Sequence, residues 1–280
     1  MTRRQFLLGV AGGLATATSG AAYVSRIEPR WLAVSRIQVP LSPPAEVSIN
    51  ILQLSDLHLS SVVPLELIEE SIELGLAENP DVIALTGDFY TGQAQQVDAY
   101  ASVLSCLSQR APTFACLGNH DGGRWSQYRG GLKMIEAVQG LLAKAGVRCL
   151  VNERESIEVR GRRIEMLGVG DLWSGMCQPQ RAFANLGPRK GERRVVLSHN
   201  PDSKDLFRTL DWDLMLCGHT HGGQVRFPFW GTPFAPVRDK SMMHGLYPWQ
   251  KRWIHVTSGV GNLHGIRFNC RPEVSVITVA

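Results

Sequence analysis

Five short apolar runs in this chain each stop at a small group of residues that can hold a metal ion. In chain order the groups are "SDLH" at 55–58, "GD" at 87–88, "GNHD" at 118–121, "SHN" at 198–200 and "GHTH" at 218–221. The runs before them have the length and composition of buried strands. Ligand sites of open α/β sheets lie outside the strand ends, where loops from separate strands converge. The sequence therefore predicts that the five groups meet in one site.

Helical segments separate the first of these strands. An amphipathic stretch runs from Pro64 to Pro80, and further helical stretches are expected near 94–110 and 130–145. The second half contains mainly strands, with a hairpin that turns near Gly161. This order predicts an α/β fold with helical crossovers in its first half.

The chain ahead of the first strand differs in composition. Arg3 and Arg4 precede a weakly apolar stretch rich in Gly, Ala and Thr, which is typical of a twin-arginine export signal. An uncleaved membrane anchor is the alternative. We expect a signal or anchor at 1–24, a linker at 25–46 that includes the Pro/Ser-rich "VPLSPPAE", and one domain at 47–280. The signal predicts a location in the periplasm or on the outer face of the cytoplasmic membrane.

Composition narrows the function classes. The chain has 280 residues, 44% of them hydrophobic, which is enough for a sizeable core. Its net charge of +4 is mild and its Lys and Arg residues lie in short clusters, so no specific nucleic-acid partner is expected. The six cysteines form no Cys-x-x-Cys pair, so the sequence does not support a zinc finger and leaves a disulfide open. We expect a monomer.

The donor atoms of the five groups indicate which metals fit. Three residues offer oxygen and four offer imidazole nitrogen: Asp56, Asp88 and Asn119, and His58, His199, His219 and His221. This mixture suits Mn, Fe, Zn or Ni better than Ca. Seven ligands are too many for one tetrahedral ion and suit two ions that share a carboxylate. The glycines at 87, 118, 218 and 222 would let the backbone come close to the ions and take positive φ.

These motifs, in this order, resemble those of the calcineurin-like metallophosphoesterases, and among them most closely the bacterial YaeI-type phosphodiesterases. The stretches that carry the resemblance are the twin-arginine start, "SDLH", "APTFACLGNHD", "GDLWSG", "SHNPDS", "WDLMLCGHTHGGQ", "PFAPV" and "NCRPEV". The resemblance covers nearly the whole chain after residue 24. It implies a four-layer α/β/β/α sandwich of two mixed sheets, with the metals at the strand ends.

The resemblance also implies a role for each residue. The first ion is assigned Asp56, His58, the bridging Asp88 and His221, and the second is assigned Asp88, Asn119, His199 and His219. His120 becomes a histidine near the leaving group that is not a ligand. Ser198 stands where many members have glycine, and it is small enough to leave the assignment of His199 intact. We also expect Thr220 to point away from the ions, as alternate residues of an extended chain do.

Charge and metal chemistry predict the reaction. Two divalent ions with Asp56 and Asp88 leave two positive charges, which a bridging hydroxide and a singly charged phosphodiester would cancel. Two-metal sites activate water at neutral pH and clamp the attacking and leaving oxygens. We therefore predict a metal-dependent phosphoric diester hydrolase in which hydroxide attacks phosphorus directly. His120 would protonate or hydrogen-bond the departing oxygen.

The physiological substrate is less constrained by the sequence. Residues 225–253 combine aromatic and basic side chains, and they form either a loop packed on the sheet or a lip that touches a membrane surface or a lipid-linked substrate. Related enzymes that cleave the pyrophosphate of UDP-2,3-diacylglucosamine keep a pyrophosphatase of this kind as an alternative, although an exported enzyme would not meet that cytoplasmic lipid. A second alternative, a non-catalytic metal-stabilised binding module, would need neither seven ligands nor His120.

Overall fold

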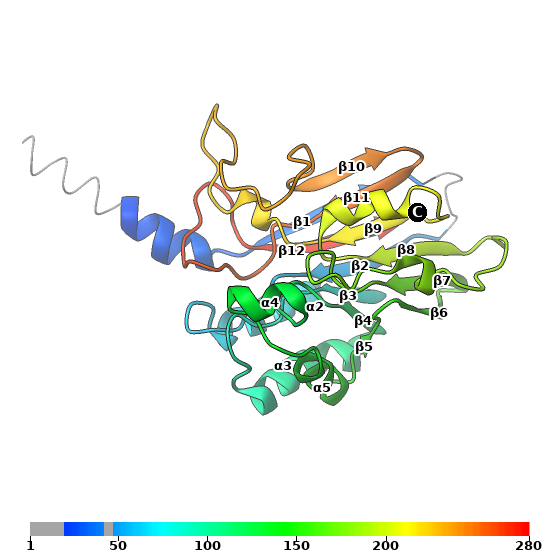
Figure 1. Ribbon diagram of the computed structural model, residues 1–280, viewed down its shortest axis with the longest axis horizontal. Helices are drawn as coiled ribbons and strands as arrows, with labels where there is room; N and C mark the ends of the chain where they lie inside the picture. The colour runs from blue at the N-terminus through cyan, green and yellow to red at the C-terminus, as the bar shows by residue number, and fades with distance from the viewer. Residues whose placement is uncertain (1–19, 42–46, 280) are drawn as a thin grey trace, which may run out of the picture.

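Two six-stranded mixed sheets lie face to face in the computed structural model, which describes residues 20–41 and 47–279 (Figure 1). The strand order is β1-β12-β2-β3-β4-β5 in the first sheet and β10-β11-β9-β8-β7-β6 in the second. Helices flank the pair, so the predicted α/β/β/α sandwich is confirmed.

The first sheet is parallel except where β12 meets β2. Its strands are β1 (Ala33–Val39), β2 (Ile49–Leu54), β3 (Val82–Thr86), β4 (Thr113–Cys116), β5 (Arg148–Cys149) and β12 (Glu273–Val279). The helices of this half are α2 (Leu65–Ala77), α3 (Val97–Arg110), α4 (Arg124–Arg129) and α5 (Glu136–Lys144). The expected stretches near 64–80, 94–110 and 130–145 therefore contain α2, α3 and α5.

The second sheet is antiparallel at both edges and parallel in its middle. Its strands are β6 (Glu153–Val159), β7 (Arg162–Gly168), β8 (Arg193–Leu197), β9 (Leu214–Cys217), β10 (Gly245–Trp249) and β11 (Arg252–Val256). The turn between β6 and β7 confirms the hairpin expected near Gly161. Short helices complete this half: α6 (Pro179–Ala182), η3 (Pro201–Phe207) and η4 (His221–Gly223).

Three apolar layers hold the sandwich together. The central layer lies between the sheets and includes Ile51 and Phe114 from the first and Leu197 and Leu216 from the second. Because both faces of each sheet are covered, β3, β4 and β9 are mainly apolar and are buried at every position. The two outer layers pack each sheet against its own helices and loops.

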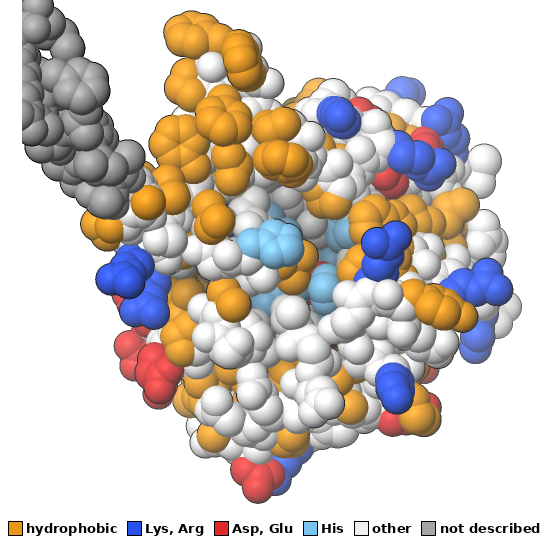
Figure 2. Space-filling view, turned by 60° about the vertical axis from the view of Figure 1, so that its left-hand side comes forward, with side chains coloured by type: hydrophobic (Ala, Val, Ile, Leu, Met, Phe, Trp, Pro, Cys, Tyr) orange, Lys and Arg blue, Asp and Glu red, His pale blue; other side chains and the backbone are white. Residues whose placement is uncertain are grey.

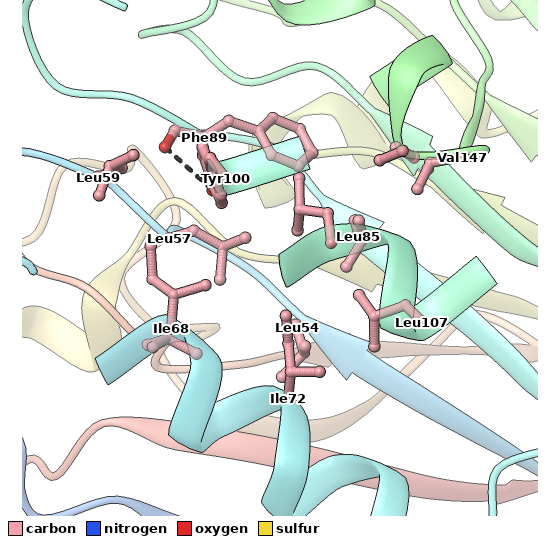
Figure 3. Close-up of a cluster of buried hydrophobic side chains, with 14 of the residues drawn as sticks. Leu54, Leu57, Leu59, Ile68, Ile72, Leu85, Phe89, Tyr100, Leu107 and Val147 are labelled. Carbon is pink, nitrogen blue, oxygen red and sulfur yellow. Dashed lines mark hydrogen bonds between the residues drawn. The ribbon is translucent and has the colours of Figure 1, made fainter. Parts of the chain in front are cut away.

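The layer under the helices also supports the loops that end β2 and β3. Ile68 and Ile72 of α2 lie against Leu54 and Leu57 at the end of β2 (Figure 3). On the neighbouring helix, the Tyr100 hydroxyl donates a hydrogen bond of 3.3 Å to the backbone carbonyl of Phe89, the residue after Asp88 (Figure 3). The hydrophobic core therefore supports the polar loops that follow β2 and β3.

The structure corrects the expected linker. Residues 33–39, inside the predicted linker at 25–46, form β1, which pairs in parallel with β12 over its whole length. The sheet therefore begins before residue 47, because β12 has a free edge that an early extended segment can fill. Residues 1–19 of the predicted signal and 42–46 of the linker lie outside the described residues. Within the described ranges, no helix combines the length and apolarity needed to cross a bilayer.

Candidate metal centre

The loops after β2, β3, β4, β8 and β9 converge at one edge of the sandwich. They bring together all seven residues predicted to bind metal, and every one of them is buried. The first sheet contributes Asp56, His58, Asp88 and Asn119, and the second contributes His199, His219 and His221. The site therefore lies across the gap between the two sheets.

One carboxylate oxygen lies at the centre of the site. Oδ2 of Asp88 is 3.5 Å from Nε2 of His58 and 3.1 Å from Nε2 of His199. The other oxygen, Oδ1, accepts a hydrogen bond of 2.9 Å from the backbone N–H of His120, which fixes the carboxylate plane. Asp88 therefore presents the same oxygen atom to histidines of both predicted ligand groups.

The side chains around His58 form the first group. Nε2 of His58 lies 3.2 Å from Nε2 of His221, and Nε2 of His221 lies 3.5 Å from Oδ1 of Asp56. About 3.4 Å separates neighbouring ligands of a tetrahedral ion with bonds of about 2.1 Å. The spacing of these three donors therefore fits one divalent ion.

A second group surrounds His199. Nδ1 of His219 lies 3.2 Å from Nε2 of His199, which in turn is 3.1 Å from Asp88. Oδ1 of Asn119 is buried and has no hydrogen-bond partner among the described residues. A buried carbonyl oxygen without a donor is costly, and a cation beside it removes that cost. This donor set also fits a divalent ion.

In three of the four predicted imidazole ligands an outer hydrogen bond fixes which nitrogen faces the centre, while Nδ1 of His221 has no such partner among the described residues. Nδ1–H of His199 donates to the carbonyl of Thr86 over 2.7 Å, and Nε2–H of His219 donates to the carbonyl of Pro236 over 3.0 Å. Nδ1 of His58 is hydrogen bonded to the Thr91 hydroxyl at 2.8 Å. In metal sites such partners orient the ring and set its tautomer. Sequence reasoning did not find these three partners, because none of them belongs to a ligand motif.

Burial keeps most of the imidazoles neutral and able to bind a cation. It lowers the pKa of His58 and of His221 to about 3, and it lowers the pKa of His219 well below its usual value. Burial also acts on His199, but the adjacent carboxylate of Asp88 outweighs it and raises the pKa of His199. The geometry that draws a proton to His199 equally favours a cation.

The two aspartates respond differently to burial. Burial raises the pKa of Asp56. It opposes ionisation of Asp88 as well, but His199 and His120 lower the pKa of Asp88 well below its usual value. Of the two aspartates, Asp88 is therefore the one whose charged form the protein favours, in agreement with its place at the centre.

Two motif glycines are required by the carboxylates themselves. A Cβ on Gly118 would lie 2.1 Å from Oδ1 of Asp88, and a Cβ on Gly218 would lie 2.3 Å from Oδ2 of Asp56. The other two behave as expected for turns, because Gly87 has φ +90° and Gly222 has φ +59°. The glycines thus let the backbone approach the ligand side chains.

Asp121, the last residue of "GNHD", holds the loops in place. Its carboxylate accepts hydrogen bonds of 2.8 Å from the backbone N–H groups of Asp88, Phe89 and Gly118. Burial outweighs these bonds and raises the pKa of Asp121 to about 7. Asp121 ties the loop after β3 to the loop after β4, which places Asp88 beside Asn119.

His120 lies at the edge of the site, beside Trp125. The centroid of its ring lies 5.0 Å from that of His58 and 4.7 Å from that of Trp125. Its Nδ1 is buried and has no hydrogen-bond partner among the described residues. The ring centroids of Trp125 and Trp173 lie 5.8 Å apart, and those of Trp173 and His219 lie 4.3 Å apart. A ring nitrogen of His120 also lies within 4.8 Å of donor atoms of His58 and Asp88. The tryptophans were not predicted to belong to the site.

The backbone around Thr220 differs from the extended chain that we expected. His219 and His221 have positive φ, and Thr220 between them has the helical values φ −77° and ψ −20°. The Thr220 hydroxyl leaves the site because it donates to the carbonyl of Met243 over 2.7 Å and accepts from the N–H of Gly222. A tight turn, and not strand alternation, sets the two histidines side by side.

The aromatic segment at 225–253 divides into two parts. Its end forms the hairpin β10–β11, where Trp249 stacks on Trp212 at 5.8 Å, so this part packs on the sheet. Its beginning projects from the surface, with Phe229, Trp230 and Phe234 exposed. Figure 2 shows a hydrophobic projection above a hollow in which histidines are visible.

Comparison with known proteins agrees with this geometry. The family model "Calcineurin-like phosphoesterase" matches residues 49–223, which include all five motifs. The phosphodiesterase YaeI of Escherichia coli is 43% identical over 279 residues, covering 99% of this chain and 98% of that protein. This chain belongs to the calcineurin-like phosphoesterase family. It is therefore an enzyme, a metal-dependent phosphoesterase, which decides against the non-catalytic binding module.

More distant similarities concern a second relative and a solved structure. The UDP-2,3-diacylglucosamine pyrophosphatase LpxG of Chlamydia muridarum is 23% identical over 303 residues, covering 91% of each chain. The structure of the Haemophilus influenzae NAD nucleotidase NadN superimposes with a TM-score of 0.51 at 13% identity, over 76% of this chain and 46% of that one. The latter shows a shared fold alone.

Proposed function

We propose that this protein is a phosphodiesterase that uses two divalent ions, of Mn, Fe, Zn or Ni, held by the seven ligand residues. The observation that carries the proposal is the single Asp88 oxygen lying within 3.5 Å of imidazoles from both ligand groups. When bound, two such ions supply water that is activated at neutral pH and positive charge for the phosphoryl oxygens.

The charges of the residues favour a diester over a monoester. Among the seven ligands only Asp56 and Asp88 carry negative charge, which leaves two positive charges beside two divalent ions. An anionic nucleophile and a singly charged diester bring the total to zero, whereas a doubly charged monoester leaves an excess charge in a buried site. The similarity to a protein named as a phosphodiesterase supports the same choice.

The residues outside the ligand set prepare the substrate. His120 provides a ring nitrogen at the edge of the site that can hold a proton for the departing alcohol oxygen. Trp125 and Trp173 form a chain of ring contacts from His120 to His219 and would give the leaving group an apolar wall. In this proposal hydroxide attacks phosphorus directly, so no residue of the protein becomes phosphorylated.

Hydrolysis of bis(4-nitrophenyl) phosphate and of 4-nitrophenyl phosphate, by full-length protein loaded with Mn²⁺, tests the proposal. We expect a higher kcat/KM for the diester and two ions per chain by elemental analysis. Asp88→Asn should bind less metal and lose activity, because both ion sites use this carboxylate. Metal-loaded protein that hydrolyses neither ester, or that prefers the monoester, would refute the proposed reaction.

A pyrophosphatase that acts on a lipid-linked nucleotide is the second candidate. It is favoured by an apolar pocket that includes the ligand His221 in its wall, and by the similarity to LpxG. Release of the nucleoside monophosphate from UDP-2,3-diacylglucosamine, measured beside the chromogenic diester, separates the two candidates. A much higher kcat/KM for the nucleotide lipid would favour the second.

We also propose that the enzyme is exported or held at the outer face of the membrane through its N-terminal segment. Arg3 and Arg4 support this, because the twin-arginine route depends on such a pair. Replacing both with lysine should keep the protein in the cytoplasmic fraction of cells, while the unmodified chain is found in the membrane or periplasmic fraction. Equal distribution of the two forms would contradict the proposal.

A further inference from the structure

An apolar pocket of about 510 Å³ adjoins the metal centre. Its wall includes Val225, Phe234, Pro236, Leu263, Ile266 and the predicted ligand His221. The size falls within the usual range of about 300–1,000 Å³ for small-molecule sites. Of these six residues, only His221 is a predicted metal ligand. A substrate whose phosphorus lies at the metals could extend an apolar group directly into this pocket.

One rim of the pocket belongs to a projecting segment, residues 226–234, which we call the aromatic finger. Phe227 and Gly231 exchange backbone hydrogen bonds of 2.8 and 3.0 Å, which close a tight turn. At its tip Phe229 is fully exposed with φ +67°, and Trp230 is 88% exposed. Left-handed backbone is rarely adopted by a bulky aromatic residue, so the fold holds this side chain outward at a cost in conformational energy.

The aromatic finger is fixed to the fold at its base and lies close to the metal centre. Arg226 donates its backbone N–H to the carbonyl of Phe268 over 2.9 Å, and the rings of Phe227 and Phe268 lie 5.8 Å apart. Just beyond its end, the carbonyl of Pro236 binds the metal-ligand His219. Whatever the tip contacts is therefore held next to the pocket and the metals.

The start of the described chain lies on the same side. Gly20, Ala21 and Val24 line a hollow together with Val225 and Phe227, and the N–H of Arg267 donates to the carbonyl of Val24 over 2.9 Å. Gly20, Ala21 and Val24 belong to the segment 1–24, the predicted signal or anchor. An anchor entering at this point would hold the aromatic finger against the membrane.

The chemistry of the aromatic finger suits a lipid surface. Its sequence "RFPFWGTPF" contains four aromatic residues, one arginine and no acid. Tryptophan and phenylalanine bury readily at the boundary between headgroups and acyl chains, and an arginine can keep its charge in the headgroup layer. Exposed apolar side chains of this density mark an interaction surface.

From these observations we infer that the substrate is a membrane lipid with a phosphodiester headgroup, one of whose chains enters the pocket while the aromatic finger rests in the bilayer surface. The inference rests on the proposed phosphodiesterase activity and adds the class of alcohol that the enzyme recognises. The pocket gives affinity for the chain, and the aromatic finger gives access to the substrate in the membrane.

The pocket is tested with methyl and octyl 4-nitrophenyl phosphate, two soluble diesters that differ only in chain length. Burying methylene groups should raise the kcat/KM of full-length, Mn²⁺-loaded enzyme for the octyl ester about tenfold or more above the methyl ester. Ile266→Asp and, as a second variant, Leu263→Asp should bring this ratio close to one. Ile266 is 41% exposed, so its replacement is compatible with folding.

The aromatic finger is tested with a long-chain 4-nitrophenyl phosphodiester embedded in vesicles of phosphatidylethanolamine and phosphatidylglycerol. Phe229→Asp and Trp230→Asp should each lower hydrolysis of the embedded substrate about fivefold or more, while the octyl-to-methyl ratio in solution is retained. Val97→Asp is the matched control, because it adds the same charge at an exposed apolar position on α3, on the other side of the molecule (Figure 1). It should leave both measurements unchanged.

The outcomes separate the two proposals. If the enzyme hydrolyses neither soluble ester, the phosphodiesterase activity itself is refuted. Equal kcat/KM for the methyl and octyl esters refutes the lipid pocket alone, and equal hydrolysis in vesicles by Phe229→Asp and Val97→Asp refutes the role of the aromatic finger. A dimer that Phe229→Asp converts to a monomer, with an octyl-to-methyl ratio of one, would show that a second copy of the chain covers this surface.

Discussion

Nδ1 of His120 is buried and has no hydrogen-bond partner in the described structure, a property that it shares with His221 among the histidines of the centre. The outer nitrogens of His58 and His199 are both hydrogen bonded, as expected of ligands whose rings must be fixed. Replacing His120 with asparagine should lower kcat for the diester about 10² to 10⁴-fold, the usual contribution of an acid or base. Metal content measured on the same sample should stay at the wild-type value. Loss of metal together with activity would make His120 a ligand.

At Gly118 the smallest possible side chain should disturb the site. Gly118→Ala places a Cβ where Oδ1 of Asp88 now lies, so the central carboxylate must move. A displacement of about 1 Å in a catalytic group costs on the order of 10²-fold in rate. Gly140→Ala in α5 is the control, since nothing lies within 4 Å of its Cβ and alanine favours the helix. Diesterase assays should show a large loss for the first variant and none for the second.

At the scale of elements, one carboxylate ties β12 to the loop that follows β11. Oε2 of Glu273 accepts hydrogen bonds of 2.8 Å from the N–H of Ser258 and 2.9 Å from the ring of His244. Burial alone would raise the pKa of Glu273, but these donors lower it well below its usual value. The ionised form is therefore favoured in the folded state, and its stabilising effect is present above about pH 4.3 and is lost as the pH falls below that.

Glu273→Gln should accordingly reduce the free energy of unfolding at pH 7 by about 1–3 kcal/mol, the cost of leaving buried donors poorly paired. Urea unfolding at pH 7 and at pH 4 should show a smaller difference between the wild type and Glu273→Gln at the lower pH. Glu69→Gln, at an exposed position of α2, serves as the control and should change neither value. A deficit that is independent of pH would contradict the ionic role of Glu273.

The sequence predicted the positions of the helices and strands better than it predicted which strands pair and which residues orient the ligands. Apolar runs that stop at polar residues are a local signal, so the strands ending at Asp56 and Asp88 could be placed from it. Strand pairing is not local: β12 lies between β1 and β2, which are more than 200 residues away, and nothing in its alternating pattern names them. The residues that orient the ligands, such as Thr91 and the carbonyl of Pro236, were missed for the same reason.

At the scale of the whole molecule, the metal centre joins two sheets that otherwise meet through an apolar layer. Four of the seven proposed ligands follow strands of the first sheet and three follow strands of the second. Ions bound by these residues would cross-link the sheets in the folded state and would have no comparable site in the unfolded chain. Metal at about a hundredfold excess over its Kd adds about 2.7 kcal/mol of stability, and removing it should lower Tm by roughly 5–10 °C.

Calorimetry of the full-length protein with Mn²⁺ and with excess EDTA measures this effect. Asp88→Asn is the appropriate comparison, because removing the shared carboxylate weakens both ion sites while the apolar layer between the sheets is unchanged. It should melt near the temperature of the chelated wild type and respond little to EDTA. If chelation left the Tm of the wild type unchanged while abolishing activity, the ions would be catalytic without joining the sheets, and the apolar layer alone would hold the two halves together.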